Sequence, residues 1–296
     1  MREPRFTPDK LDATLAEVCA RLGLDHREAR LLRFTNNAVY QLASAPVVVR
    51  IVGSHTLRHR TYKVVRVAEY FAGQGVPAVR LYPGARQPIV VGDDIATVWW
   101  QVPDSPPPPT ATDLARLLRQ VHALPVLDGV PSWSPLSDVR ARLADAEELD
   151  AVDRRFLVER CEQVHEALDR LDFRLEPALQ HGDAHLGNVL AGPGGPVLCD
   201  FDSAGIGPPE WDLVPVAVGV LRFGEPAAVY RELADAYGFD VMGWHGFPAL
   251  QAARDLKLTT SVLPILRSHP EVRPEFHRRL DDLRAGRLEV RWSRFR

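Results

Sequence analysis

Residues 181–188 read HGDAHLGN and residues 199–202 read CDFD, and these two stretches decide the fold of the chain. β-Forming residues flank them and a turn, GPGG at 192–195, separates them. Residues 179–201 are therefore predicted to run strand, loop, strand, turn and strand, which returns the second stretch to the first. Apolar residues at helical spacing precede and follow this segment, so it is a short β-interruption in a helical region.

The polar side chains of the two stretches suit phosphoryl transfer. That reaction needs a carboxylate that orients the attacking hydroxyl and accepts its proton, and oxygen ligands for the magnesium ion that neutralises phosphate charge. Asp183, Asn188 and Asp200 supply such groups. Asp183 and Asn188 keep the five-residue step between the catalytic Asp and the metal-binding Asn of protein kinases, and Asp200 precedes Phe201 as in their D-F-G motif. The spacing predicts two metal ligands facing the phosphates and Asp183 facing the acceptor.

In their longer form the two motifs resemble those of the aminoglycoside phosphotransferase family, a kinase-like group that includes choline kinases. HGDAHLGNVL spans 181–190 and LCDFDSAGIGPPEWDL spans 198–213. Weaker similarity runs through NNAVYQL (36–42), VVVRI (47–51), GVPAVRL (75–81), VWWQVP (98–103) and LARLLRQVHAL (114–124). The resemblance implies an α+β, two-lobed protein-kinase-like fold, with a small antiparallel-sheet N-lobe, a mostly helical C-lobe and the nucleotide between them.

The resemblance also implies roles for individual residues. Asp183 is expected to be the catalytic base, and Asn188 and Asp200 are expected to bind Mg²⁺. Three further residues are expected to support this set: His181, Asp202 and Asp212. The histidine is predicted to be a structural hydrogen-bonder, the first carboxylate either a metal contact or a solvated group, and the second a brace of the catalytic loop.

Sequence patterns divide the chain into two lobes. Residues 1–103 are predicted as the nucleotide-binding lobe and residues 104–296 as the catalytic and substrate-binding lobe, because the proline run at 106–109 favours an extended linker over about 103–110. The first lobe is predicted to hold mostly sheet. Its expected elements are a helix ending at Gly23, a hairpin of 31–42 with 46–52, a helix over 60–72, and strands at 88–91 and 95–102.

Arg50 is the predicted phosphate-binding cation. It stands between Val49 and Ile51 on a predicted strand, where an unpartnered charge is costly, and the family places lysine or arginine there. The alternative is an exposed position on an edge strand. An ion-pair partner is hard to place. Glu69 on the following helix is the nearest acid, but a solvated helix carboxylate is favoured there over a pair with Arg50.

Two further segments are predicted to touch the nucleotide. Thr35, Asn36 and Asn37 occupy the place of the family's nucleotide loop, without its usual glycines, so they are either side-chain ligands of phosphate or a polar hairpin turn. Trp100, Gln101 and Val102 align with the hinge whose backbone binds adenine in relatives. The resemblance favours ATP as donor, and the residues leave GTP open.

Composition narrows the class of protein. A formal net charge of -3 argues against a general nucleic-acid binder. Three cysteines without CxxC spacing indicate neither a disulfide framework nor a zinc site, which favours a reducing compartment. The first ten residues lack a signal-peptide core, and the apolar stretch at 213–221 is too short for a bilayer. A cytoplasmic protein that acts on a small molecule, without membrane or nucleic acid, is expected; nothing indicates its oligomeric state.

Two other functions were weighed. A metallohydrolase would use His181, Asp183 and His185 around one metal, but it leaves the other polar residues unexplained. A non-catalytic kinase-like nucleotide binder is motivated by the glycine-poor loop. The leading prediction is a magnesium-dependent kinase that phosphorylates a small-molecule hydroxyl, with an antibiotic such as an aminoglycoside as the acceptor by family analogy. The acidic run 145–150 either attracts a polyamine or is a solvated helix face.

Overall fold

The computed structural model describes residues 8–34, 37–52, 58–146, 148–267 and 269–295. The chain forms two compact units, and each is assembled from separate stretches of sequence. The first contains Met1–Pro109, Leu124–Val130 and Gly187–Ala204, and the second contains Thr110–Ala123, Pro131–Leu186 and Gly205–Arg296. The lobe boundary at 103–110 stays a prediction. Residues 187–204, which include the two predicted metal ligands, nevertheless belong by their contacts to the same unit as the N-terminal residues.

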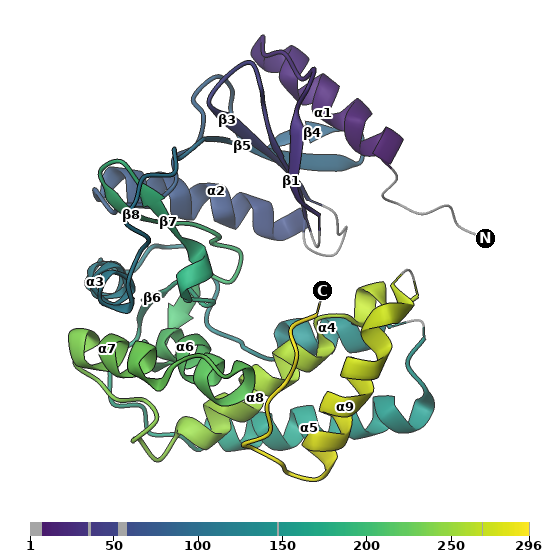
Figure 1. Cartoon of the computed structure of the whole chain (residues 1–296), viewed down its shortest axis with the longest axis vertical. Coiled ribbons are helices and arrows are strands. Elements are labelled where there is room, and N and C mark those ends of the chain that lie inside the picture. Colours follow the sequence, from purple (N-terminus) through teal and green to yellow (C-terminus); the bar gives the residue numbers. More distant parts are fainter. Residues whose placement is uncertain (1–7, 35–36, 53–57, 147, 268, 296) are drawn as a thin grey trace. The chain divides into compact units, whose positions relative to one another are not determined.

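The first unit is built on a five-stranded antiparallel sheet (Figure 1). Its strands, in spatial order, are β1 (Arg30–Phe34), β2 (Asn37–Gln41), β3 (Val47–Val52), β5 (Asp94–Trp100) and β4 (Ile89–Val91). The predicted hairpin of 31–42 with 46–52 has one strand too few. Residues 31–42 contain two strands, which pair with each other before the second pairs with β3. Each strand of this part of the sheet is therefore shorter than the apolar run suggests.

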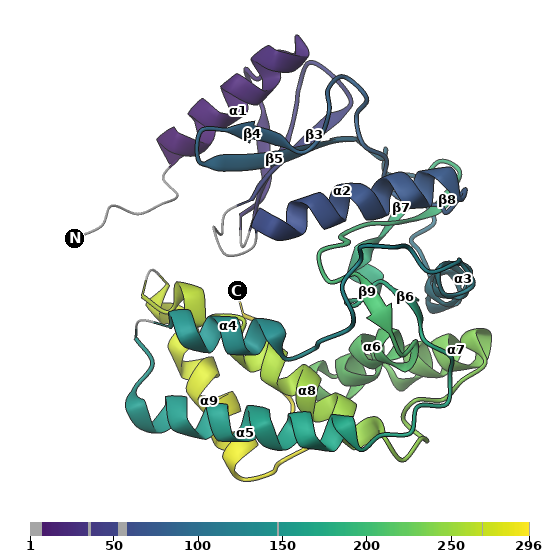
Figure 2. The same ribbon diagram turned by 180° about the vertical axis from the view of Figure 1, so that it is seen from behind.

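Two helices cover the sheet, one on each face (Figures 1 and 2). They are α1 (Pro8–Leu22) and α2 (Arg58–Gly73), and both agree with the helices predicted from spacing. Val47, Val49 and Ile51 of β3 belong to the buried cluster that includes the inner residues of α1. Because side chains alternate along a strand, Arg50 points to the opposite face, which α2 covers.

A second hairpin completes the first unit. Strands β7 (Val189–Gly192) and β8 (Gly195–Leu198) pair in antiparallel register, as predicted from the turn at 192–195. Leu198 is fastened to the N-terminal stretch, because its N–H donates to Pro77 O and its carbonyl accepts from Val79 N, each at 2.9 Å. Phe201 packs edge-on against Phe71 of α2, with ring centroids 5.2 Å apart. These contacts tie the second motif to the sheet-bearing unit.

The second unit is helical apart from one small sheet. That sheet pairs β6 (Ala178–Gln180) with β9 (Gly205–Gly207), and the second of these strands was not predicted. None of the described helices has an apolar stretch long enough to cross a membrane. The helices of this unit are α3 (Ala111–His122), α4 (Ser137–Asp145), α5 (Ala151–Asp169), α6 (Glu210–Phe223), α7 (Ala227–Tyr237), α8 (Phe247–Thr260) and α9 (Arg273–Arg284).

Candidate active site

The loop that carries Asp183 follows β6 in the second unit, and Asp212 holds it in place. Asp212 lies in the first turn of α6 and is 0% exposed. One carboxylate oxygen, Oδ2, accepts from the backbone N–H of His181 at 2.7 Å, and Oδ1 accepts from that of Gly182 at 2.6 Å. Gly182 has a φ of 81°, a left-handed conformation that a residue with a Cβ rarely adopts. The predicted brace therefore contacts the residues directly before Asp183.

A histidine that the sequence did not single out completes this brace. Nε2 of His122, at the end of α3, lies 2.9 Å from Asp212 Oδ2, and Nδ1 lies 2.8 Å from the hydroxyl of Tyr237. Because an ionised carboxylate only accepts hydrogen bonds, Nε2 carries the proton and Nδ1 accepts from the tyrosine. Trp211 adds a further contact, since its Nε1 donates to Gly182 O at 3.0 Å. Three helices thus position the loop.

His181 is fully buried in this loop. Its Nδ1 accepts from the backbone N–H of Asp183 at 3.3 Å, so the ring is engaged in holding the loop. This placement agrees with a structural hydrogen-bonder. It does not favour the metallohydrolase, which needs this ring as a metal ligand, and the described part of the chain holds no group of three or more His, Cys, Asp or Glu side chains suited to a metal.

The Asp183 carboxylate lies beside basic groups of its own unit. Nη1 of Arg254, on α8, is 2.6 Å from Oδ1, and Nε2 of His185 is 4.0 Å from Oδ2. Burial alone would raise the pKa of Asp183, but the charges of Arg254, His185 and Lys257 lower it well below its usual range. Asp183 is therefore ionised at neutral pH, which a base that accepts a hydroxyl proton requires.

Lys257 is a second cation near Asp183 that sequence reasoning missed. It lies on α8, three residues after Arg254, and its Nζ lies 5.6 Å from the ring centroid of Trp211. Desolvation lowers the pKa of Lys257 to about 8. Because residues three apart share one side of a helix, both cations lie on the same side of α8. This spacing is visible in the sequence, but the sequence does not show that Asp183 is their neighbour.

Asn188 and Asp200 both lie in the first unit. Asn188 ends a 3₁₀ turn (Leu186–Asn188) and is 4% exposed. Its carbonyl accepts from Cys199 N at 2.9 Å, which connects the beginning of the hairpin to the residue before Asp200. Asp200 itself has a φ of 67°, a conformation that aspartate tolerates better than most residues. Amide and carboxylate oxygens are the hard ligands that Mg²⁺ prefers, so the pair fits a site completed by waters and phosphate oxygens.

Arg50 has a carboxylate partner in the same unit, and it is not the glutamate suggested by the sequence. Its guanidinium forms an ion pair with Asp202. Glu69 is exposed on α2, which agrees with the solvated helix carboxylate favoured from the sequence over a pair with Arg50. Burial raises the pKa of Asp202, but Arg50 and Lys63 contribute to a net lowering. Lys63 Nζ also donates to the carbonyl oxygens of Asp202 and Ala204, both at 2.7 Å. Asp202 is thus an ion-paired and partly exposed carboxylate, with 30% of its side chain accessible.

Two of the other predicted nucleotide residues, Asn37 and Trp100, lie at the ends of strands. Thr35 and Asn36 fall outside the described residues, and Asn37 begins β2 opposite Val52. Trp100 ends β5, is 41% exposed and stacks edge-on against Tyr82 with centroids 4.8 Å apart.

Backbone donors at the predicted hinge are engaged by the protein. The N–H of Trp100 donates to Arg80 O and that of Gln101 donates to Pro46 O, each at 2.8 Å. The Val102 side chain approaches the hairpin turn, since a Cβ at Gly192 would lie 3.2 Å from its Cγ1. A base bound at this strand end would therefore use groups other than those two N–H donors.

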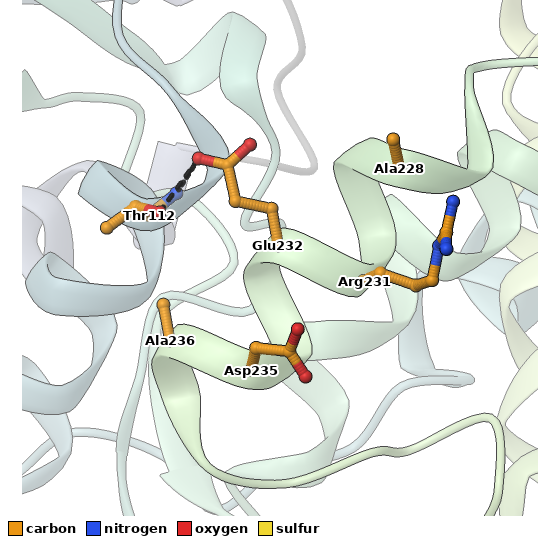
Figure 3. A pocket seen from close by; sticks show the side chains of 6 residues that line it. All are labelled: Thr112, Ala228, Arg231, Glu232, Asp235 and Ala236. Carbon is orange, nitrogen blue, oxygen red and sulfur yellow. Dashed lines mark hydrogen bonds between the residues drawn. The ribbon is translucent and has the colours of Figure 1, made fainter.

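A shallow hollow on the second unit lies away from all of these residues (Figure 3). It lies between the start of α3 and α7, and its lining is Thr112, Ala228, Arg231, Glu232, Asp235 and Ala236. Glu232 Oε1 accepts from Thr112 N at 3.0 Å and from its hydroxyl at 2.8 Å. The Glu232 carboxylate thus adds a second cap to the start of α3, which already has its own capping box. This structural role accounts for the polar contact in the hollow.

The fold and the two groups of side chains define a small-molecule phosphotransferase of the protein-kinase-like class. Residues 26–250 match the model of the phosphotransferase enzyme family, abbreviated APH, and the chain belongs to that family. Among curated proteins, no sequence matches it. The predicted two-lobed fold, with a small antiparallel sheet and a mostly helical C-terminal part, is confirmed by its solved structural neighbours.

Three of these neighbours show the range of the fold. An amicoumacin kinase in complex with AMP-PNP, Ca²⁺ and its ligand is 13% identical, with a TM-score of 0.73 over 98% of this chain and 96% of that one. The aminoglycoside phosphotransferase APH(2")-IIIa with GDP and kanamycin is 18% identical, with a TM-score of 0.61 over 93% and 98%. Choline kinase LicA from Streptococcus pneumoniae is 13% identical, with a TM-score of 0.66 over 92% and 99%.

Proposed function

We propose that this chain is a magnesium-dependent kinase that transfers the γ-phosphoryl group of a nucleotide to a hydroxyl of a small molecule. The observation that carries the proposal is the braced loop of the second unit, which presents an ionised Asp183 directly after a backbone turn fixed by a fully buried carboxylate. A turn of this kind has no reason to be held so firmly unless the residue that it presents must be positioned.

Asp183 is the proposed base. Its carboxylate accepts a hydrogen bond from the acceptor hydroxyl, aligns the oxygen for attack and takes the proton as the bond to phosphorus forms. Arg254 keeps this carboxylate ionised and, through the contact of 2.6 Å, orients it. Asp212, His122 and Trp211 hold the backbone of the loop.

Residues of the first unit are proposed to bind the donor. Asn188 and Asp200 would hold Mg²⁺, which, when bound, neutralises charge on the phosphates. Arg50 would contact phosphate oxygens on the face of the sheet that α2 covers, and its ion pair with Asp202 keeps the guanidinium at that place. Trp100, Gln101 and Val102 are the proposed base-binding segment. ATP is the proposed donor, with GTP as the alternative that the same residues allow.

Two variants and a nucleotide-release assay test the proposal. The purified chain is given Mg²⁺ with ATP or GTP and a panel of aminoglycosides, other hydroxylated antibiotics, choline and sugars, and formation of the nucleoside diphosphate is measured. Asp183→Ala is expected to abolish transfer and keep nucleotide binding, whereas Asp200→Ala is expected to weaken binding of the magnesium nucleotide. A fully active Asp183→Ala variant would refute the role of the base.

The rival function is a kinase-like protein that binds nucleotide without transferring phosphate. It differs in one outcome, which is nucleotide binding without turnover for every acceptor in the panel. A chain that binds no nucleotide at all would contradict both functions. A cytoplasmic location remains a prediction from composition.

A further inference from the structure

The surroundings of Asp183 in the second unit are basic, which bears on the chemistry of the acceptor. Arg254 and Lys257 lie on consecutive turns of α8 next to this single carboxylate, and both contribute to its lowered pKa. His185 is the third neighbour, but burial lowers its pKa, so it adds little charge at neutral pH. A polycationic acceptor would meet repulsion from the residues closest to the base.

Lys257 differs from Arg254 in its ion pairing. Arg254 is engaged by Asp183, whereas Lys257 forms no ion pair with any carboxylate among the residues that the structure describes. The charged groups that face its ammonium are Asp138 and Arg142 of α4, together with Arg254 and Asp183. Asp138 and Asp183 favour the charged ammonium, whereas Arg254 and Arg142 oppose it. A half-buried cation in this position is costly unless something anionic binds it.

Lysine is also an uncommon choice in this chain. Of its 36 lysines and arginines, only Lys10, Lys63 and Lys257 are lysines. Two of these three lie beside predicted site residues, Lys63 on the carbonyl of Asp202 and Lys257 near Asp183. Lys257 is thus not one of the generic surface cations, which are arginines here.

Two carboxylates of the acidic run at 145–150, the predicted attraction for a polyamine, make structural contacts. Glu148 forms an ion pair with Arg273. Asp150 is the N-cap of α5, and its side chain accepts from the N–H groups of Val152 and Asp153 at 2.7 and 2.9 Å. These carboxylates serve the fold, which leaves the basic surroundings of Asp183 as the charge that an acceptor meets.

We propose that the acceptor is a hydroxy acid, and that Lys257 binds a carboxylate that the acceptor carries close to the hydroxyl presented to Asp183. The inference rests on the proposed kinase function and names the substrate class of that site. One unpaired cation matches a monoanion better than a phosphate dianion. Trp211, whose ring centroid lies 5.6 Å from the ammonium and whose Nε1 donates to Gly182 O, places Lys257 beside the loop that presents Asp183.

Matched probe pairs that differ only in the carboxylate test this inference. Saturation-transfer NMR on the full chain is run with glycerate against glycerol, gluconate against glucose, and N-acetylserine against N-acetylserinamide. We expect signals from the acids and little or none from their neutral partners. Equal signals within every pair, or stronger signals from the neutral members, would overturn the proposal, and this comparison needs no variant to fold.

Three substitutions then assign the effect. Lys257→Met keeps the apolar stem and is expected to weaken binding of the acid by roughly 10- to 100-fold, the range of a hydrogen bond to a charged group. Lys257→Arg, which keeps the charge, should retain most of the binding. Arg231→Met removes an exposed cation of α7 and is the matched control, with no expected change. Acid binding that survives Lys257→Met unchanged would contradict the assignment to this residue.

Nucleotide binding, measured on the same samples with a fluorescent nucleotide and Mg²⁺, separates the two levels of inference. If the wild-type chain binds nucleotide but does not prefer the acids, only the substrate class falls. If it binds no nucleotide, the kinase function falls as well. A loss of nucleotide affinity in Lys257→Met would instead place the lysine on a phosphate of the donor, which also overturns the proposal.

Discussion

Asp212→Asn tests the brace of the catalytic loop most directly. The buried carboxylate accepts three hydrogen bonds, from the backbone N–H groups of His181 and Gly182 and from His122. An asparagine has one acceptor oxygen, so in either orientation its NH₂ group faces at least one of these donors. The buried N–H left without an acceptor costs about 1–3 kcal/mol, and the hydrogen bonds that remain lose the carboxylate charge, about 1 kcal/mol each.

The expected total is a loss of about 3–5 kcal/mol, a large part of the 5–15 kcal/mol that stabilises a typical domain. Urea unfolding is followed by tryptophan fluorescence, which reports mainly on the second unit because Trp133, Trp211, Trp244 and Trp292 lie there. At a urea concentration where the variant is still folded, displacement of Asp183 is expected to lower kcat by about 100-fold.

Glu232→Gln is the matched control. Glu232 also accepts from a backbone N–H and a second donor, both from Thr112, but it is exposed at the hollow of Figure 3. Solvent replaces what the substitution removes, so the loss is expected to stay below about 1 kcal/mol, with kcat unchanged. If the two variants lose the same small free energy, the reasoning that the buried carboxylate holds the loop is refuted.

The remaining predictions concern charge and pKa. Arg254→Met removes the largest cause of the lowered pKa of Asp183, so that pKa rises, and kcat/KM should begin to fall at a higher pH on the acidic side than in the wild type; identical pH profiles would contradict this. Arg50→Met is expected to weaken nucleotide binding by roughly 10- to 100-fold in a fluorescence titration, and an unchanged Kd would remove Arg50 from the donor site. Burial and the neighbouring Asp200 raise the pKa of Cys199 to about 12, so little thiolate is present at pH 8. Alkylation of Cys199 by iodoacetamide, measured by mass spectrometry, should therefore be at least about 100-fold slower than alkylation of a free thiol. Rapid labelling of Cys199 would show that its pKa is ordinary.

Sequence alone predicted the parts of the site that depend on spacing along the chain. Asp183, Asn188 and Asp200 stand at fixed intervals around a turn, and a hairpin brings its own ends together whatever surrounds it. Their placement on the loop, the 3₁₀ turn and the end of the hairpin agrees with that prediction, and their chemical roles remain to be measured. The helices over 8–22 and 60–72 were predictable for the same reason, since an apolar stripe at helical spacing is a local signal.

Partners distant in sequence were not predictable. Arg50 pairs with Asp202, which lies 152 positions away, and no local spacing in the sequence connects the two residues. Strand β9 has the sequence Gly-Ile-Gly, which is poor in β-formers, and it is extended because it pairs with β6. His122 looked like an ordinary residue at the end of a helix until packing of the second unit placed it on Asp212. In each case the decisive neighbour comes from tertiary structure.

The discontinuous make-up of the two units limits how this enzyme can be recombined with others. A chimera joined at the proline run would take the five-stranded sheet from one parent and residues 187–204 from another. Leu198 would then have to find substitutes for its hydrogen bonds to Pro77 and Val79, and Phe201 a substitute for Phe71. Exchange of the N-terminal residues together with 124–130 and 187–204 preserves these contacts. A shuffled library that respects those three segments should therefore yield more folded members than one cut at the linker alone.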